Sequence, residues 1–186
     1  MYMKEYKGMP IYHETIAEAS HQPALIYAIE NSIGDILELG CGNSSTYLIS
    51  HMVKNTNRKI VSVEHNYEWM KTFLHMTSQN HSFELAENTN WNKSTDIYCN
   101  RSWGVVLVDQ GVVPEIGNPA RTYSAQRLVN CSEYVIVHDA EQLPWIQYPP
   151  KSTEYNWKVF SPKYGGPHTY ILSTKHDLKN ITINED

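Results

Sequence analysis

Four short apolar runs constrain the fold of this 186-residue chain more than any other feature. The runs are Ile36–Leu39, Ile60–Glu64, Val105–Val108 and Tyr134–Val137, and each is followed by an amphipathic or polar stretch. The last two are apolar on both faces, which is typical of parallel strands covered by helices on both sides. Strands that alternate with helices predict a parallel sheet with right-handed crossovers.

The rest of the chain supplies the other elements of such a sheet. Helices are expected at 13–31, with a break at Pro23, and at 44–52, 67–76 and 121–130. A weaker strand is expected at 82–86, and 157–161 and 169–173 alternate as antiparallel strands do. We therefore expect an α/β fold, doubly wound, with a mostly parallel seven-stranded Rossmann-like sheet and a reversed final strand. The ligand site of such a sheet lies at the carboxyl ends of its strands.

The length fits one domain over 1–186. We expect a helical N-terminal segment of about 1–32, a ligand-binding core of about 33–140, and a C-terminal loop and strand pair of about 141–175. With 41% hydrophobic and 19% charged residues, the composition is globular. A chain of this size needs no disulfide or metal to stabilise its core.

Charge and cysteine content narrow the partners and the compartment. The net charge of -5 disfavours a nucleic-acid substrate, because binding to the phosphate backbone needs a basic face. The apolar runs are strand-length, so no membrane span is expected. The N-terminus is polar, and three cysteines without a CxxC pattern indicate free thiols, so we expect a cytoplasmic protein.

A glycine turn follows the first strand, in the sequence Glu38-Leu39-Gly40-Cys41-Gly42-Asn43-Ser44. Glycine lets the backbone approach a ligand closely, and amides at the start of the next helix can receive a carboxylate or a phosphate. Glu64 ends the second strand, 22 residues after Gly42, where an acidic side chain can accept hydrogen bonds from ribose hydroxyls. The third glycine of a dinucleotide fingerprint is absent, which favours a nucleoside ligand without a diphosphate.

These motifs resemble those of class I S-adenosylmethionine-dependent methyltransferases. Glu38–Gly42 is similar to their first motif, Val63–Asn66 to their second-strand motif, and Val106–Asp109 to their fourth-strand motif. The resemblance covers roughly 33–140. It implies that the cofactor, S-adenosylmethionine, binds at Glu38, Gly40, Gly42, Asn43, Ser44, Glu64, His65, Glu87, Asn88 and Asp109. Glu64 would hold the ribose, Glu87 or Asn88 would lie near the adenine, and Asp109 would lie beside the methionine end.

The acceptor side is expected at the end of the fifth strand, in Val137-His138-Asp139. In a doubly wound sheet this end lies beside that of the fourth strand, so Asp109, His138 and Asp139 should converge. Histidine can remove a hydroxyl proton near neutral pH, and Asp139 could orient it. The alternative is that His138 and Asp139 only cap their strand and the following segment.

A metal site is a second interpretation of the same acidic residues. Asp109 and Asp139 offer the oxygen ligands that Mg²⁺ prefers, and catechol-type methyltransferases carry acidic residues at these strand ends. Their third ligand follows directly, where this chain has Ala140, unless Glu141 replaces it.

The sequence thus predicts an O-methyltransferase that acts on a small-molecule or glycan hydroxyl, most similar to small sugar-modifying enzymes. The alternatives are a catechol-like, metal-assisted enzyme, a nicotinamide-dependent oxidoreductase and a non-catalytic nucleoside-binding module. His21 could fold over a ligand or only mark a helix break, and Arg121 could clamp an acceptor or be solvated. Late aromatic residues could bind a sugar or cover the core; they are Trp145, Tyr148, Tyr155, Tyr164 and His168.

Overall fold

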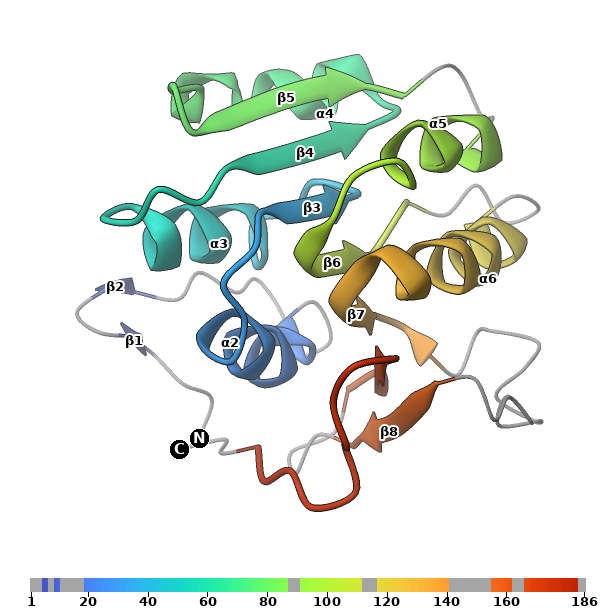
Figure 1. The fold of residues 1–186 in the computed structure, drawn as a ribbon. Helices are drawn as coiled ribbons and strands as arrows, with labels where there is room; N and C mark the ends of the chain where they lie inside the picture. The colour runs from blue at the N-terminus through green and yellow to red at the C-terminus, as the bar shows by residue number, and fades with distance from the viewer. Residues whose placement is uncertain are drawn as a thin grey trace.

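The computed structural model describes residues 5–6, 9–10, 19–86, 91–111, 117–140, 155–161 and 166–183, and it confirms the expected α/β fold (Figure 1). The strands of the main sheet are β3 (Ile36–Leu39), β4 (Ile60–Glu64), β5 (His81–Leu85), β6 (Trp103–Val108), β7 (Ser132–Val137), β8 (Asn156–Phe160) and β9 (Thr169–Ser173). The helices are α2 (Gln22–Glu30), α3 (Thr46–Val53), α4 (Tyr67–Lys71), α5 (Trp91–Tyr98) and α6 (Gly117–Leu128), with 3-10 turns at Leu74–Met76 and Val129–Cys131.

The seven strands lie in the order β5-β4-β3-β6-β7-β9-β8. The first five are mutually parallel, and β9 runs antiparallel to both β7 and β8. From β3 the chain builds outward to β5, then returns to place β6 on the other side of β3. The strand order therefore reverses between β3 and β6, where doubly wound sheets bind their ligands.

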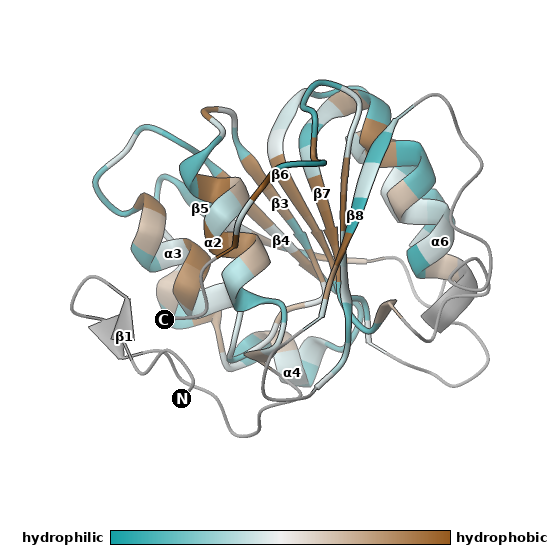
Figure 2. Ribbon diagram, turned by 90° about the horizontal axis from the view of Figure 1, so that it is seen from below, coloured by the Kyte–Doolittle hydropathy of each residue, from teal (hydrophilic) through white to brown (hydrophobic). Residues whose placement is uncertain are grey.

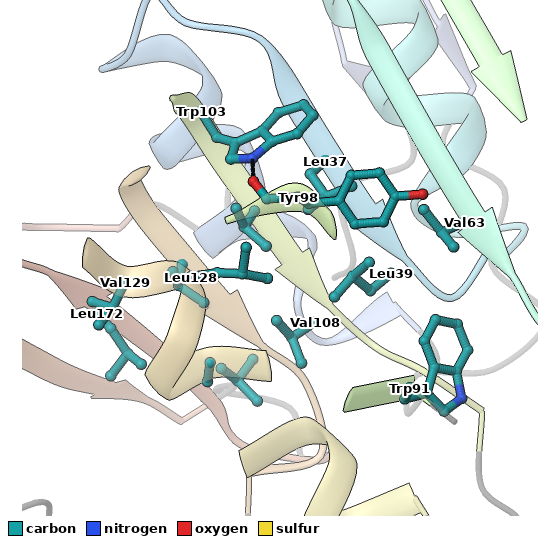
Figure 3. Close-up of a cluster of buried hydrophobic side chains, with 14 of the residues drawn as sticks. Leu37, Leu39, Val63, Trp91, Tyr98, Trp103, Val108, Leu128, Val129 and Leu172 are labelled. Carbon is teal, nitrogen blue, oxygen red and sulfur yellow. Dashed lines mark hydrogen bonds between the residues drawn. The ribbon is translucent and has the colours of Figure 1, made fainter. Parts of the chain in front are cut away.

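Two apolar layers hold the helices on the sheet. On one face, α2 and α3 pack on Ile36, Val105 and Ile136. On the other face, α5 and α6 pack on Leu37 and other strand residues, and the cluster is drawn in Figure 3. Figure 2 shows the largely apolar strands of the sheet between the helices. Within the part of the chain that the structure describes, no helix combines the length and the apolar character needed to cross a membrane.

Three elements differ from the sequence-based expectations. The helix α5 was not expected. Its buried residues have helical spacing, but two of the four carry hydroxyl groups and so do not form an apolar stripe in the sequence; the four are Trp91, Ser94, Thr95 and Tyr98. The helix expected at 67–76 ends at Lys71 and resumes as a 3-10 turn. In the N-terminal segment expected to be helical, β1 (Glu5–Tyr6) pairs with β2 (Met9–Pro10).

Candidate active site

The carboxyl ends of four neighbouring strands meet at one edge of the sheet. The amide of Gly40, after β3, donates to the carbonyl of Val63 at 2.8 Å. The Asp109 amide, after β6, donates to Leu39 O at 2.8 Å, and the His138 amide, after β7, donates to the carbonyl of Val108 at 3.2 Å. The glycine turn, Asp109 and His138 therefore lie side by side, as the sequence predicted.

Gly40 is required by the backbone. Its φ is +94°, a conformation that L side chains rarely adopt. A Cβ at this position would collide with the carbonyl oxygen of Asp109, so the turn packs directly on the residue after β6. At Gly42, by contrast, a Cβ would meet only Ser45 Oγ, at 3.4 Å. Packing within the protein therefore requires glycine at Gly40 and not at Gly42, and the close approach of a ligand to either glycine stays a prediction.

Glu38 lies beneath the glycine turn and is completely buried. Its Oε1 accepts hydrogen bonds from Ser45 Oγ at 2.6 Å and Thr46 Oγ1 at 2.9 Å. Its Oε2 accepts one from Ser62 Oγ at 2.6 Å. Burial raises the pKa of Glu38 to about 7, although the three hydroxyl donors favour the charged form. The carboxyl group thus links β3, β4 and the start of α3 by hydrogen bonds, and these bonds hold the glycine turn in place.

Replacing Glu38 by glutamine should change how stability depends on pH. The folded-state pKa of about 7 lies above the ordinary value of 4.5, so between these values the folded protein binds more protons than the unfolded chain. Glu38 should therefore lower the free energy of unfolding by up to about 3 kcal/mol as pH rises through this window. The Glu38→Gln variant should lack this decrease in urea denaturation at pH 4.5 to 8.

The difference between the two stability curves isolates Glu38, because most other groups titrate alike in both proteins. Curves that run parallel from pH 4.5 to 8 would show that Glu38 is ionised normally in the folded state.

Glu64, the predicted ribose ligand, is 3% exposed and fixed by backbone donors. The amides of His65 and Asn66 each donate to its Oε1 at 2.8 Å, and the Cys41 amide donates to Oε2 at 3.1 Å. His65 Nδ1 also lies 2.8 Å from Oε1. The carboxylate therefore lies beside the glycine turn, and its contact with a ribose stays a prediction.

Three backbone amides of the turn before α3 donate hydrogen bonds within the turn itself. The amides of Ser45 and Thr46 both donate to Gly42 O, at 3.2 and 2.9 Å. The Gly42 amide in turn donates to Thr46 Oγ1 at 3.0 Å.

An acid–base centre lies at the ends of β6 and β7. His138 Nδ1 lies 3.1 Å from Asp109 Oδ1, and its Nε2 lies 3.0 Å from Ser20 Oγ. His138 is 5% exposed. Burial opposes its protonation, but the Asp109 carboxylate raises the pKa of His138 above the ordinary value. Burial alone would raise the pKa of Asp109, yet His138 and then Arg121 hold it well below its usual range.

Arg121 is a buried part of this centre and not a solvated residue. It is 2% exposed, and it lies 3.0 Å from Asp109 Oδ1 and 2.8 Å from Asp139 Oδ2. It also donates to the carbonyls of Gln110 at 3.0 Å and His138 at 2.9 Å. Arg121 therefore ties the ends of β6 and β7 together.

Asp139 is oriented by Arg121 more than by His138. Its Oδ1 lies 3.8 Å from His138 Nε2, beyond a hydrogen bond, whereas Oδ2 pairs with the guanidinium. Its φ of +50° places it in the left-handed region, which is uncommon for a residue other than glycine. The predicted roles of Asp139, orienting the base or binding Mg²⁺, are untested, and the arginine already neutralises this carboxylate.

Two residues of the centre come from the segment before α2. Ser20 bonds to His138, and the ring of His21 lies edge-on to His138 with centroids 4.5 Å apart. Both are 1% exposed. Sequence reasoning missed Ser20 altogether and singled out His21 only through the neighbouring proline, since no periodic pattern places this segment over the sheet.

Several predicted residues stay outside the centre or outside the described residues. Asn43 and Ser44 lie in the glycine turn, and the carbonyl of Ser44 accepts a hydrogen bond from Gln22 Nε2 at 2.7 Å. His65 lies edge-on to Trp91, with ring centroids 5.7 Å apart. The residues outside the described ranges are Glu87, Asn88, Glu141, Trp145, Tyr148 and Tyr164.

Solved structures with the same architecture are methyltransferases. No family model and no curated protein matches the chain. A proposed O-methyltransferase from Klebsiella pneumoniae is similar over 88% of this chain and 83% of its own, with a TM-score of 0.60 and 13% identity. The chain has a Rossmann-like methyltransferase fold.

Two further structures widen the range of acceptors found on this fold. An rRNA methylase from Streptococcus thermophilus has a TM-score of 0.59 and 10% identity, over 87% of this chain and 99% of its own. The O-methyltransferase TomG from Streptomyces achromogenes, solved with S-adenosylmethionine, has a TM-score of 0.53 and 9% identity, over 84% and 79%. A methyltransferase fold therefore does not by itself identify the acceptor.

Proposed function

We propose that this protein is an S-adenosylmethionine-dependent O-methyltransferase whose acceptor is a hydroxyl of a sugar or glycan. The observation that carries the proposal is the position of His138. It is held between a carboxylate and a hydroxyl, and that carboxylate belongs to Asp109, which packs on the Gly40 turn at the reversal point of the sheet. This is the arrangement that a base for a hydroxyl acceptor needs.

The cofactor side fits S-adenosylmethionine. The Gly40 turn packs too closely for any side chain, and Glu64 lies beside it at the end of β4. When bound, the cofactor supplies an electrophilic methyl group. Neighbouring structures solved with S-adenosylmethionine or its product support this choice. We assign the methionine end to the neighbourhood of Asp109 and the ribose to Glu64.

The acceptor side uses the His138–Asp109 pair. Asp109 holds Nδ1 of His138, so Nε2 faces a hydroxyl, the place that Ser20 Oγ takes in this structure. An acceptor hydroxyl there would give its proton to Nε2, and its oxygen would take the methyl group as the methyl–sulfur bond breaks and S-adenosylhomocysteine leaves. The Asp109 carboxylate stabilises the imidazolium that forms, and correct positioning supplies much of the remaining rate.

A carbohydrate acceptor is favoured over RNA by charge. The net charge is -5, whereas nucleic-acid binding needs a basic face. Tyr155 and His168, two of the late aromatic residues, lie next to β8 and β9, and the carbonyl of His168 accepts a hydrogen bond from the Ala140 amide at 2.8 Å. This places His168 near the acceptor end of β7. Free Cys41, Cys99 and Cys131 are consistent with the proposed cytoplasmic location.

The first test is calorimetric titration with S-adenosylmethionine, S-adenosylhomocysteine and NAD, followed by a methyl-transfer assay on a panel of sugars. We expect both sulfur nucleosides to bind and NAD not to bind. Glu64→Gln should weaken S-adenosylmethionine binding about 10- to 100-fold, because a hydrogen bond to a charged group contributes roughly 1.5–3 kcal/mol.

The matched control is Glu68→Ala, since Glu68 on α4 is exposed and pairs only with Lys71 among the described ion pairs. It should bind the cofactor as the wild type does. Binding of NAD alone would favour an oxidoreductase, and cofactor binding without turnover on any acceptor would favour a nucleoside-binding module. Equal affinity of Glu64→Gln and wild type would remove Glu64 from the ribose site.

A further inference from the structure

His21 is an isolated polar side chain in the interior. It is 1% exposed, and among the residues that the structure describes neither ring nitrogen has a hydrogen-bond partner. Buried polar atoms are almost always hydrogen-bonded, because leaving one unpaired costs about 1–3 kcal/mol. Neither the cofactor side nor the proposed base gives His21 a role.

The ring of His21 lies against the acid–base centre. One ligand atom each from His21, Asp109 and His138 can be chosen so that all three lie within 4.8 Å of one another. The ligand atoms of a tetrahedral zinc ion with nitrogen and oxygen ligands are about 3.3 Å apart. His138 Nδ1 and Asp109 Oδ1 are 3.1 Å apart, and the 4.8 Å limit on the three ligand atoms means that no pair of them needs to close by more than roughly 1.5 Å.

We propose that His21, Asp109 and His138 form a binding site for a late first-row divalent metal ion such as zinc. Two imidazoles and one carboxylate are ligands typical of zinc, iron, nickel and copper, whereas Mg²⁺ prefers oxygen alone. Three protein ligands leave a fourth position open, as in catalytic zinc sites. The proposal concerns binding of the ion and holds whether or not the protein transfers methyl groups.

The surroundings complete the site. His138 Nε2 lies 3.0 Å from Ser20 Oγ, and metal-binding histidines usually bond a neighbouring group through their second nitrogen. The charged groups beside the ligands are Arg121, from α6, and Asp139, after β7. Together with Asp109 they leave one net negative charge when both imidazoles are neutral, which favours a cation.

This site differs from the magnesium site predicted from the sequence. Both include Asp109, which pairs with Arg121 at 3.0 Å, as Asp139 does at 2.8 Å, but the further ligands here are the imidazoles of His21 and His138 instead of the Asp139 carboxylate. A metal bound at His138 Nδ1 would leave a proton on Nε2, directed at Ser20. His138 cannot then serve as a base, so metal loading should inhibit the proposed methyl transfer.

The test is calorimetric titration of metal-free protein with Zn²⁺, with neither S-adenosylmethionine nor acceptor present. We expect one zinc ion per chain and an affinity at least about tenfold lower in His21→Ala and His21→Gln, because each loses one ligand. The glutamine variant keeps most of the side-chain volume, so it should fold even if the alanine variant does not. Far-UV circular dichroism checks that each variant is folded.

The matched control is His81→Ala. His81, on β5, is also buried and also has an Nδ1 without a partner in the described part of the chain, but it lies at the other edge of the sheet. It should leave zinc binding unchanged. Equal zinc affinity in wild type and His21→Ala, or no binding to the wild type, would overturn the site. Mg²⁺ binding that is lost in Asp139→Ala but kept in His21→Ala would overturn it in favour of the oxygen site.

Discussion

A His138→Ala enzyme is expected to transfer methyl groups about 10²- to 10⁴-fold more slowly than wild type, the usual contribution of a positioned base. The imidazole is the group that links the Asp109 carboxylate to the hydroxyl position. Its affinity for S-adenosylmethionine should stay near wild type, because the glycine turn and Glu64 do not bond to the His138 side chain in the described contacts. The rate is measured as S-adenosylhomocysteine release with the best acceptor of the sugar panel, in metal-free buffer.

The control for this substitution is His75→Ala, an exposed histidine next to α4. It should keep full turnover. Full turnover in His138→Ala as well, with a normal circular dichroism spectrum, would exclude His138 as the base. A rate loss that is matched by an equal loss of cofactor affinity would assign His138 to binding.

Arg121→Ala should lower the free energy of unfolding by about 3–5 kcal/mol, the usual cost of removing one member of a buried ion pair. The guanidinium contacts two carboxylates and two backbone carbonyls. Without it, Asp139 loses its ion-pair partner at 2.8 Å, and the carbonyls of Gln110 and His138 lose donors. Urea denaturation at neutral pH measures the loss.

Arg127 supplies the matched control, because it lies on the same helix and pairs with Asp96 at the surface. Arg127→Ala should cost much less than Arg121→Ala, because water screens an exposed ion pair. Arg121→Lys keeps the charge but lacks the planar fork, so its stability should fall between wild type and alanine. Equal losses for Arg121→Ala and Arg127→Ala would mean that the buried network contributes no more than a surface pair.

Much of the fold could be predicted from apolar runs because parallel strands buried on both faces need them. Val105–Val108 and Tyr134–Val137 lie within β6 and β7. The helix α5 could not be predicted in the same way, since Ser94 and Thr95 fill its buried stripe and bond across to α6 through Thr95 Oγ1 and Ser124 Oγ, 2.7 Å apart. Small hydroxyl residues look polar in sequence, yet they pack well where two helices meet.

The candidate site could be predicted only where strand ends define it. Asp109 and His138 follow β6 and β7, and the strand order brings them together. Ser20 and His21 arrive from before α2, and Arg121 from within α6, so their positions depend on tertiary packing that leaves no periodic signal. The residues that bury His21 and Arg121 lie far from them in the sequence, so a local pattern cannot show that these side chains are buried.

The hydrogen bond from Gln22 to the carbonyl of Ser44 has a thermodynamic consequence. Gln22 begins α2 directly after Ser20 and His21, and Ser44 belongs to the glycine turn. This bond therefore joins the glycine turn to the segment that holds Ser20 and His21, and we expect a ligand that shifts the turn to act on the residues beside His138. Linkage requires reciprocity: whatever factor the nucleoside applies to the affinity of an acceptor or an ion, that acceptor or ion must apply to the nucleoside.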